Sequence, residues 1–164
     1  MKKTVNIVVI GTEPPCPRCD LLDVLVRQAA PHELAVDIQH CAFDSDFAQQ
    51  LGKSLDRKIG TARHVADKAG ILMNWDSVYT LIKQKTSPLD PDFRPADAWT
   101  QELDDILRPC QDIAEASGCL MTPVLVIDDK VVHHGSVPAI EQIISWLSNE
   151  LSNASKSADC QGIL

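Results

Sequence analysis

The chain has 164 residues, of which 45% are hydrophobic, and a formal net charge of −8. This length fits one domain with room for a large insertion, and the apolar content is enough for a core without disulfide bonds. The acidic balance excludes non-specific nucleic-acid binding and disfavours docking on anionic membranes, because both need an excess of Lys and Arg.

The N-terminal stretch MKKTVNIVVIG is too short in apolar residues for a secretory signal. No stretch reaches the ~18 apolar residues that a membrane-spanning helix needs. We therefore expect a cytoplasmic monomer with no nucleic-acid or membrane partner. In a reducing compartment its six cysteines should be mostly free thiols: Cys16, Cys19, Cys41, Cys110, Cys119 and Cys160.

Three elements are predicted at the start of the chain. Residues 4–11, TVNIVVIG, form a β-branched run that is typical of a strand buried on both faces. Apolar residues then recur at helical spacing from residue 21 to 29, and this helix should end before Pro31. Alternating apolar and polar residues in 33–43 predict a second strand, so we expect a right-handed βαβ unit with parallel strands.

The middle of the chain, 44–118, is helical in composition and is divided into about four helices by Gly60, Gly70 and the cluster SPLDPDFRP. We interpret it as an all-helical insertion. The segment PVLVIDDKVVHHG then predicts a β-hairpin. A final helix should pack on the sheet through one apolar face: Ile140, Ile143, Ile144, Leu147 and Leu151. Residues 153–164 are expected to form a flexible tail.

The segment CPRC, residues 16–19, stands where the first strand gives way to the first helix. Cys16 in the first helical turn would face unpaired N–H groups and the positive end of the helix dipole, which favour the thiolate. Arg18 adds a nearby cation, and this arrangement can lower a thiol pKa from ~8.5 to between ~3.5 and 7.5. Cys16 is therefore the predicted nucleophile, and Cys19 is placed to resolve the mixed disulfide.

Other interpretations of the cysteine pair remain open. Structural zinc normally needs a second ligand pair, which the chain does not offer. A soft metal or metalloid could be bound, without catalysis, by Cys16, Cys19 and Cys119. The two cysteines could also only pack, or the fold could serve as an interaction module.

The remaining candidates have simpler interpretations. Cys41 and Cys119 are expected in the core, and Cys160 in the tail is expected to be inert. His133 and His134 are expected at a solvated hairpin end. The segment TARHVADKAGILMNWDSVYTLI places Ala66 and Gly70 as a helix-turn-helix would, but its next apolar residues, Val78 and Leu81, fall about two residues late and it lacks a basic recognition face.

The order strand, CPRC, helix, strand, followed by GCLMTPVLVIDDKVVHHGSVP and a terminal helix, resembles the thioredoxin/glutaredoxin superfamily. The resemblance covers about residues 4–43 and 118–152. It implies an α/β thioredoxin-like fold, with a mixed sheet of about four strands flanked by helices. The domain would comprise 1–43 and 119–152, and the insertion 44–118 gives a layout similar to DsbA-like proteins.

The resemblance also assigns substrate-binding positions. It implies that Pro123 is a cis-proline beside the cysteines. The backbone of Thr122 would then pair with an extended substrate by strand addition. Pro17 and Arg18 are expected to contact substrate as well.

Some family positions differ in this chain. Pro15 replaces the tryptophan before the first cysteine, and Ile10 replaces the buried acid of the first strand. No acidic residue directly follows Gly135, where glutaredoxins hold glutathione. The CPRC segment and the resemblance together predict a thiol–disulfide oxidoreductase without a bound cofactor or metal. We expect it to act on protein or small-molecule disulfides and to use an unidentified electron donor.

Overall fold

The computed structural model describes residues 3–83 and 91–160, without the side chains of 154, 155 and 157–160. Within these residues no helix combines the length and apolarity that crossing a membrane requires.

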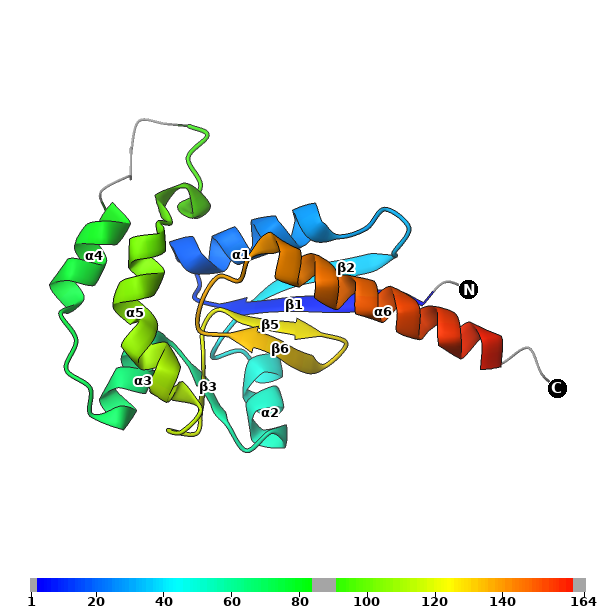
Figure 1. Ribbon diagram of the computed structural model, residues 1–164. Coiled ribbons are helices and arrows are strands. Elements are labelled where there is room, and N and C mark those ends of the chain that lie inside the picture. Colours follow the sequence, from blue (N-terminus) through cyan, green and yellow to red (C-terminus); the bar gives the residue numbers. More distant parts are fainter. Residues whose placement is uncertain (1–2, 84–90, 161–164) are drawn as a thin grey trace.

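A mixed four-stranded sheet forms the centre of the molecule (Figure 1), with strand order β2-β1-β5-β6. Strand β1 (Val5–Gly11) pairs in parallel with β2 (Val36–Ala42) and antiparallel with β5 (Val124–Ile127). Strand β6 (Lys130–His134) completes an antiparallel hairpin with β5. The α/β class, the parallel first pair and the hairpin are confirmed.

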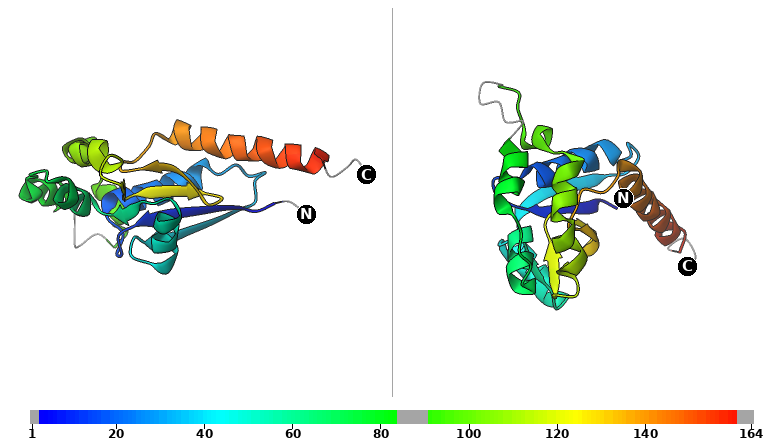
Figure 2. Two further views of the ribbon diagram at one scale, coloured as in Figure 1. Left: turned by 90° about the horizontal axis from the view of Figure 1, so that it is seen from below. Right: turned by 60° about the vertical axis from the view of Figure 1, so that its left-hand side comes forward.

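Helices cover both faces of this sheet, as the views in Figure 2 show. Helices α1 (Pro17–Ala29) and α6 (Ile140–Cys160) pack on one face, where Ile7 and Val9 of β1 enter their core. Helix α2 (Asp46–Ser54) packs on the other face, and Ile10 belongs to that core. Strand β1 is thus buried on both sides, because its apolar residues face two layers of helices.

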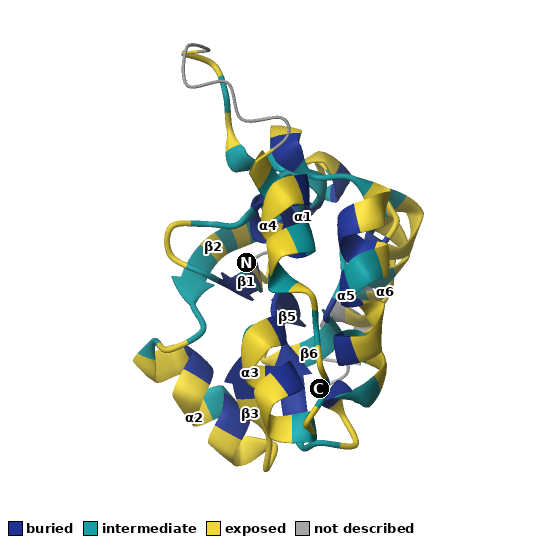
Figure 3. Ribbon diagram, turned by 90° about the vertical axis from the view of Figure 1, so that its left-hand side faces the viewer, coloured by how far each residue is buried: buried dark blue, intermediate teal, exposed yellow. Residues whose placement is uncertain are grey.

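Most of the middle segment lies at one end of the sheet, beside the N-terminus of α1 (Figures 1 and 3). It contains α3 (Ala62–Ala69), α4 (Trp75–Lys83), the 3₁₀ turn η1 (Pro95–Ala98) and α5 (Gln101–Ala114). These helices share a core of their own. Figure 3 shows the buried positions of α3 and α5 turned inward and the exposed ones outward.

The middle segment is not all-helical, and that prediction is wrong at one point. Strand β3 (Lys58–Gly60) pairs in parallel with β4 (Cys119–Met121) in a second, two-stranded sheet. Three residues are too few to display strand alternation, and their partner strand lies about 60 residues further along the chain. Ile59 is buried together with α2 against the four-stranded sheet. This part of 44–118 therefore helps to cover the face of that sheet opposite α1 and α6.

The last helix differs from the prediction in the exposure of one apolar residue and in its length. Ile143 and Leu147 are fully buried, as expected, but Ile144 is 43% exposed. The helix continues to Cys160, where a flexible tail was expected from residue 153. Serine and alanine are compatible with a helix, and residues 140–161 contain no Pro or Gly that would end it. The thiol of Cys160 and residues 161–164 lie outside the described part.

Candidate active site

Cys16 is the N-cap of α1, which begins at Pro17. Its backbone N–H donates to Oγ1 of Thr12 at 2.9 Å, and the same hydroxyl donates to the carbonyl of Pro14 at 3.0 Å. Proline suits the first helical position because it has no N–H that would need a partner there. The loop between β1 and α1 therefore fixes Cys16 at the positive end of the helix.

The sulfur atoms of Cys16 and Cys19 lie 3.0 Å apart, and both residues are free thiols. The sulfur of Cys16 also lies 3.4 Å from the backbone N–H of Cys19, which donates to it. Cys16 is partly exposed, whereas Cys19 is fully buried. Cys16 is therefore the more open residue of the pair, and the buried Cys19 lies within 3.0 Å of its sulfur.

The two thiols differ strongly in acidity. A hydrogen bond from the Cys19 thiol, helped by the backbone N–H groups and the charge of Arg18, lowers the pKa of Cys16 to about 6 against the opposing effect of burial. The same hydrogen bond, together with burial, raises the pKa of Cys19 well above its usual value. Near neutral pH this gives a thiolate at Cys16 and a thiol at Cys19.

Gly11, the last residue of β1, makes room for the inner thiol. A Cβ atom at this position would lie 2.6 Å from Sγ of Cys19, much closer than atoms can pack. This role was not predicted from the sequence, although a glycine that ends an otherwise β-branched strand was the available signal.

Arg18 is buried and holds three separate segments together. Its Nε lies 2.5 Å from Oδ1 of Asp104 on α5. Its Nη1 donates to the carbonyl of Thr122 at 3.2 Å, and its Nη2 donates to the carbonyl of Gly135. The other oxygen of Asp104 accepts the N–H of Val137 at 3.1 Å. Arg18 is therefore a clamp and not a cation that faces solvent.

A groove of about 240 Å³ opens beside Cys16. The CPRC segment contributes Cys16, Pro17 and Arg18 to its wall. The middle segment supplies most of the apolar lining of the groove: Trp75, Val78, Tyr79, Ile82, Leu103 and Leu107. Cys16 thus lies at the border of a largely apolar hollow.

Comparison with known proteins agrees with this architecture. Residues 98–148 match the protein family described as a thioredoxin domain. This match and the α/β architecture with its mixed four-stranded sheet support a thioredoxin-like fold. The match includes α5, β4, the β5–β6 hairpin and the start of α6, but not the CPRC segment. No curated protein and no solved structure matches the chain. A thioredoxin-like domain suggests a redox-type function.

The backbone at Thr122 is arranged differently from what the thioredoxin-like resemblance implies for substrate binding. The Thr122–Pro123 peptide bond is cis, but Thr122 is only 3% exposed. Its N–H donates to the carbonyl of Gly60 at 2.9 Å, and its carbonyl accepts from Arg18. Its backbone is therefore not free to pair with a substrate strand, although Thr122 does line the groove.

The first strand has an apolar residue where the thioredoxin-like resemblance would place a buried acid. Ile10 is completely buried in the core beneath the sheet. The acid nearest in sequence to the cysteines is Asp20, which is bound to Arg94 through two oxygens at 2.7 and 3.0 Å. This pairing lowers the pKa of Asp20. Asp20 is thus an ionised anchor for η1 and not a proton shuttle.

Two of the other candidate cysteines lie in the core, whereas the two hairpin histidines are not at a solvated end. Cys119 is buried in the core of the middle segment, as expected, and Cys110 lies in the same core. His133 is not at a solvated end: its ring centroid lies 5.9 Å from that of Trp146, and burial lowers its pKa. Nδ1 of His134 accepts the N–H of Met121 at 3.3 Å.

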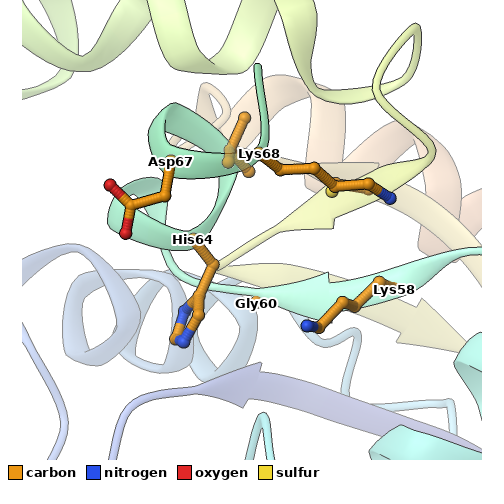
Figure 4. A pocket seen from close by; sticks show the side chains of 7 residues that line it. Lys58, Gly60, His64, Asp67 and Lys68 are labelled. Atoms are coloured by element: carbon orange, nitrogen blue, oxygen red, sulfur yellow. The ribbon is translucent and has the colours of Figure 1, made fainter. Parts of the chain in front are cut away.

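A separate cavity of about 350 Å³ lies against β3 and α3 (Figure 4), and neither CPRC cysteine lines it. Its cationic side chains are the exposed lysines Lys58 and Lys68, while Asp67 extends to the opposite side of α3 from Lys68 (Figure 4). Exposed lysines around a hollow do not by themselves define a ligand. Of these two hollows, only the smaller groove is lined by a cysteine of the CPRC segment.

Proposed function

We propose that this protein is a thiol–disulfide oxidoreductase in which Cys16 is the nucleophile and Cys19 is the resolving cysteine. The observation that carries the proposal is the sulfur pair itself: an accessible thiolate with a pKa near 6 lies 3.0 Å from a buried, protonated thiol. Separation of roles between two thiols is what the two-step exchange of a disulfide requires.

In the reducing direction the Cys16 thiolate attacks one sulfur of a substrate disulfide, R–S–S–R. The substrate S–S bond breaks, one thiolate RS⁻ leaves, and a Cys16–S–S–R bond forms. Cys19 then loses its proton and attacks Sγ of Cys16, which releases the second RS⁻. The substrate gains two electrons and the cysteine pair becomes a disulfide, which an external dithiol returns to the reduced form.

The middle segment has a supporting role in this proposal. We assign the redox domain to 1–43 and 119–152, with α2 and β3 of the 44–118 segment covering one face of its sheet. We treat α3, α4 and α5 of that segment as a cap, because they form the apolar wall beside Cys16. Arg18 acts as a positioning residue. Its charge favours the Cys16 thiolate, and its side chain binds Asp104 of the cap and the carbonyl of Thr122. Soft-metal binding is less well supported, because the described residues include no group of three His, Cys, Asp or Glu side chains suited to a metal.

Trapping of the mixed disulfide tests the proposal. The Cys19→Ala variant, treated with bis(2-hydroxyethyl) disulfide, should accumulate a Cys16 adduct that peptide mass spectrometry locates. Wild type should instead end as the Cys16–Cys19 disulfide, and Cys16→Ala should form no adduct at Cys19. Cys110→Ala is the matched control for removing a buried thiol. An adduct mainly at Cys41 or Cys110 would contradict the proposal.

A further inference from the structure

The position where an extended substrate could add to the fold is already filled by the chain itself. Strand addition uses the backbone N–H and C=O of an exposed strand edge. At Thr122 both groups are engaged, the N–H with the carbonyl of Gly60 and the carbonyl with Arg18. A polypeptide substrate therefore finds no free backbone group at this residue.

The bonds that fill this position are not easily released. Gly60 is the end of β3, and its pairing with Met121 in the register of β3 and β4 continues directly into the bond to Thr122. Arg18 is buried and held by Asp104 and Gly135. Freeing the two groups of Thr122 would leave buried polar atoms without partners, which is costly.

What remains open beside Cys16 is the groove, and its chemistry is apolar. Its volume of about 240 Å³ lies just below the ~300–1,000 Å³ of pockets for drug-sized ligands. Trp75 and Tyr79 of α4 supply aromatic surface, and Leu103 and Leu107 of α5 supply aliphatic surface. The guanidinium of Arg63 lies 5.7 Å from the centroid of the Trp75 ring.

We propose that Cys16 acts on low-molecular-mass disulfides that carry a compact apolar group of about aromatic size, and that extended polypeptide disulfides are excluded. This inference rests on the proposed function and adds a substrate class to it. The apolar group enters the groove against Trp75 and Tyr79, which brings its disulfide to the Cys16 sulfur at the border. The exchange steps and their electron balance are those given above.

Single-turnover exchange with three probes tests the substrate class. The reduced protein is mixed with 4,4′-dithiodipyridine, with bis(2-hydroxyethyl) disulfide, or with a disulfide-linked pair of unstructured ten-residue peptides. Each rate is divided by the rate of the same probe with 2-mercaptoethanol, which cancels the intrinsic reactivity of the disulfide. The normalised rate should be at least about tenfold higher for the aromatic probe than for the hydroxyethyl probe, and lowest for the peptide probe.

Variants of the groove separate binding from thiol reactivity. Trp75→Ala and Tyr79→Ala should lower the normalised rate of the aromatic probe by about tenfold. In each variant the aromatic-probe rate is divided by the rate of alkylation by iodoacetamide, so that any change in the reactivity of the Cys16 thiol is cancelled. Tyr79 is 43% exposed, so its replacement is the safer variant for folding. Leu72→Ala is the matched control, because this side chain is 99% exposed and outside the groove.

The outcomes distinguish the inference from the function on which it rests. Equal normalised rates for all three probes, or a highest rate for the peptide, would overturn the substrate class and leave the oxidoreductase intact. An aromatic preference that persists unchanged in both groove variants would also overturn it. Absence of exchange with every probe would overturn the proposed function and the inference together.

Discussion

Asp104 on α5 and Arg18 in the CPRC segment form a buried ion pair, with Oδ1 2.5 Å from Nε and side chains that are 4% and 6% exposed. The pair links the cap to the redox motif across 86 residues of sequence. Because the charge of Arg18 also favours the Cys16 thiolate, one arginine serves both the packing of the cap and the reactivity of the nucleophile.

Replacing Asp104 by Asn should destabilise the protein strongly. The variant leaves the Arg18 guanidinium buried without a countercharge, which costs about 3 kcal/mol in the free energy of unfolding. Urea denaturation measures this loss. Asp105→Asn is the matched control, since Asp105 is exposed and pairs with Arg108 at the surface. Similar unfolding curves for the two variants would contradict the assigned role of Asp104.

The alkylation rate of Cys16 by iodoacetamide should rise with pH and reach half of its plateau near pH 6, because the thiolate is the reacting form. Peptide mass spectrometry follows each cysteine separately on reduced, metal-free protein. In Cys19→Ala the midpoint should move to higher pH, because the largest cause of the lowered pKa has been removed. A wild-type midpoint near the ~8.5 of a free thiol would remove the physical basis of the redox proposal.

The stability of the reduced protein should depend on pH through Cys16. Its pKa is about 6 when folded and 9.0 without the fold, so between these values the unfolded chain binds more protons. The free energy of unfolding contributed by Cys16 therefore rises with pH through this window and is lost as pH falls through about 6. The raised pKa of Cys19 acts in the opposite sense above the pKa of an unfolded thiol.

Comparison with Cys16→Ala isolates this effect. Urea unfolding at pH 6 and at pH 8 should show wild type gaining stability relative to the variant at the higher pH. A difference between the two proteins that does not change with pH would show that the Cys16 thiol titrates alike in folded and unfolded chains.

Replacing Gly11 by Ala should disturb the inner thiol. Its Cβ would lie 2.6 Å from Sγ of Cys19, and relief of such overpacking costs about 1–3 kcal/mol. The displaced Cys19 would donate a weaker hydrogen bond, so the alkylation midpoint of Cys16 should rise.

Gly70→Ala provides the control for Gly11. No atom lies within 4 Å of a Cβ at Gly70, although its φ of +71° makes the substitution strained. This variant should lose stability without moving the Cys16 midpoint. An unchanged midpoint in Gly11→Ala would show that Cys19 can shift without affecting Cys16.

The sequence predicts the parts of the fold that are coded locally. The strand–CPRC–helix unit and the hairpin carry their signals within a few residues, such as the β-branched run of β1 and the turn at Asp128 and Asp129, which both have positive φ. Strand β3 was missed because three residues carry no periodicity.

In the candidate site, too, the sequence predicts what is coded locally and misses the contacts between distant segments. Cys16 and Cys19 are recognisable from their spacing, but the partners of Arg18 lie 86 to 117 residues away and only folding brings them together. The resemblance to thioredoxins suggested an open backbone at Thr122, and no local pattern indicates that Gly60 occupies it.

The burial of Arg18 has a consequence for the ionic environment of the nucleophile. Mobile ions screen exposed charges within about 10 Å at 0.1 M salt, but they cannot enter the space between a buried guanidinium and a neighbouring thiolate. Arg18 is 5% exposed and its donors are taken up by the protein. The part of the lowered Cys16 pKa that comes from the charge of Arg18 should therefore depend less on ionic strength than the pKa of a thiol activated by a surface cation.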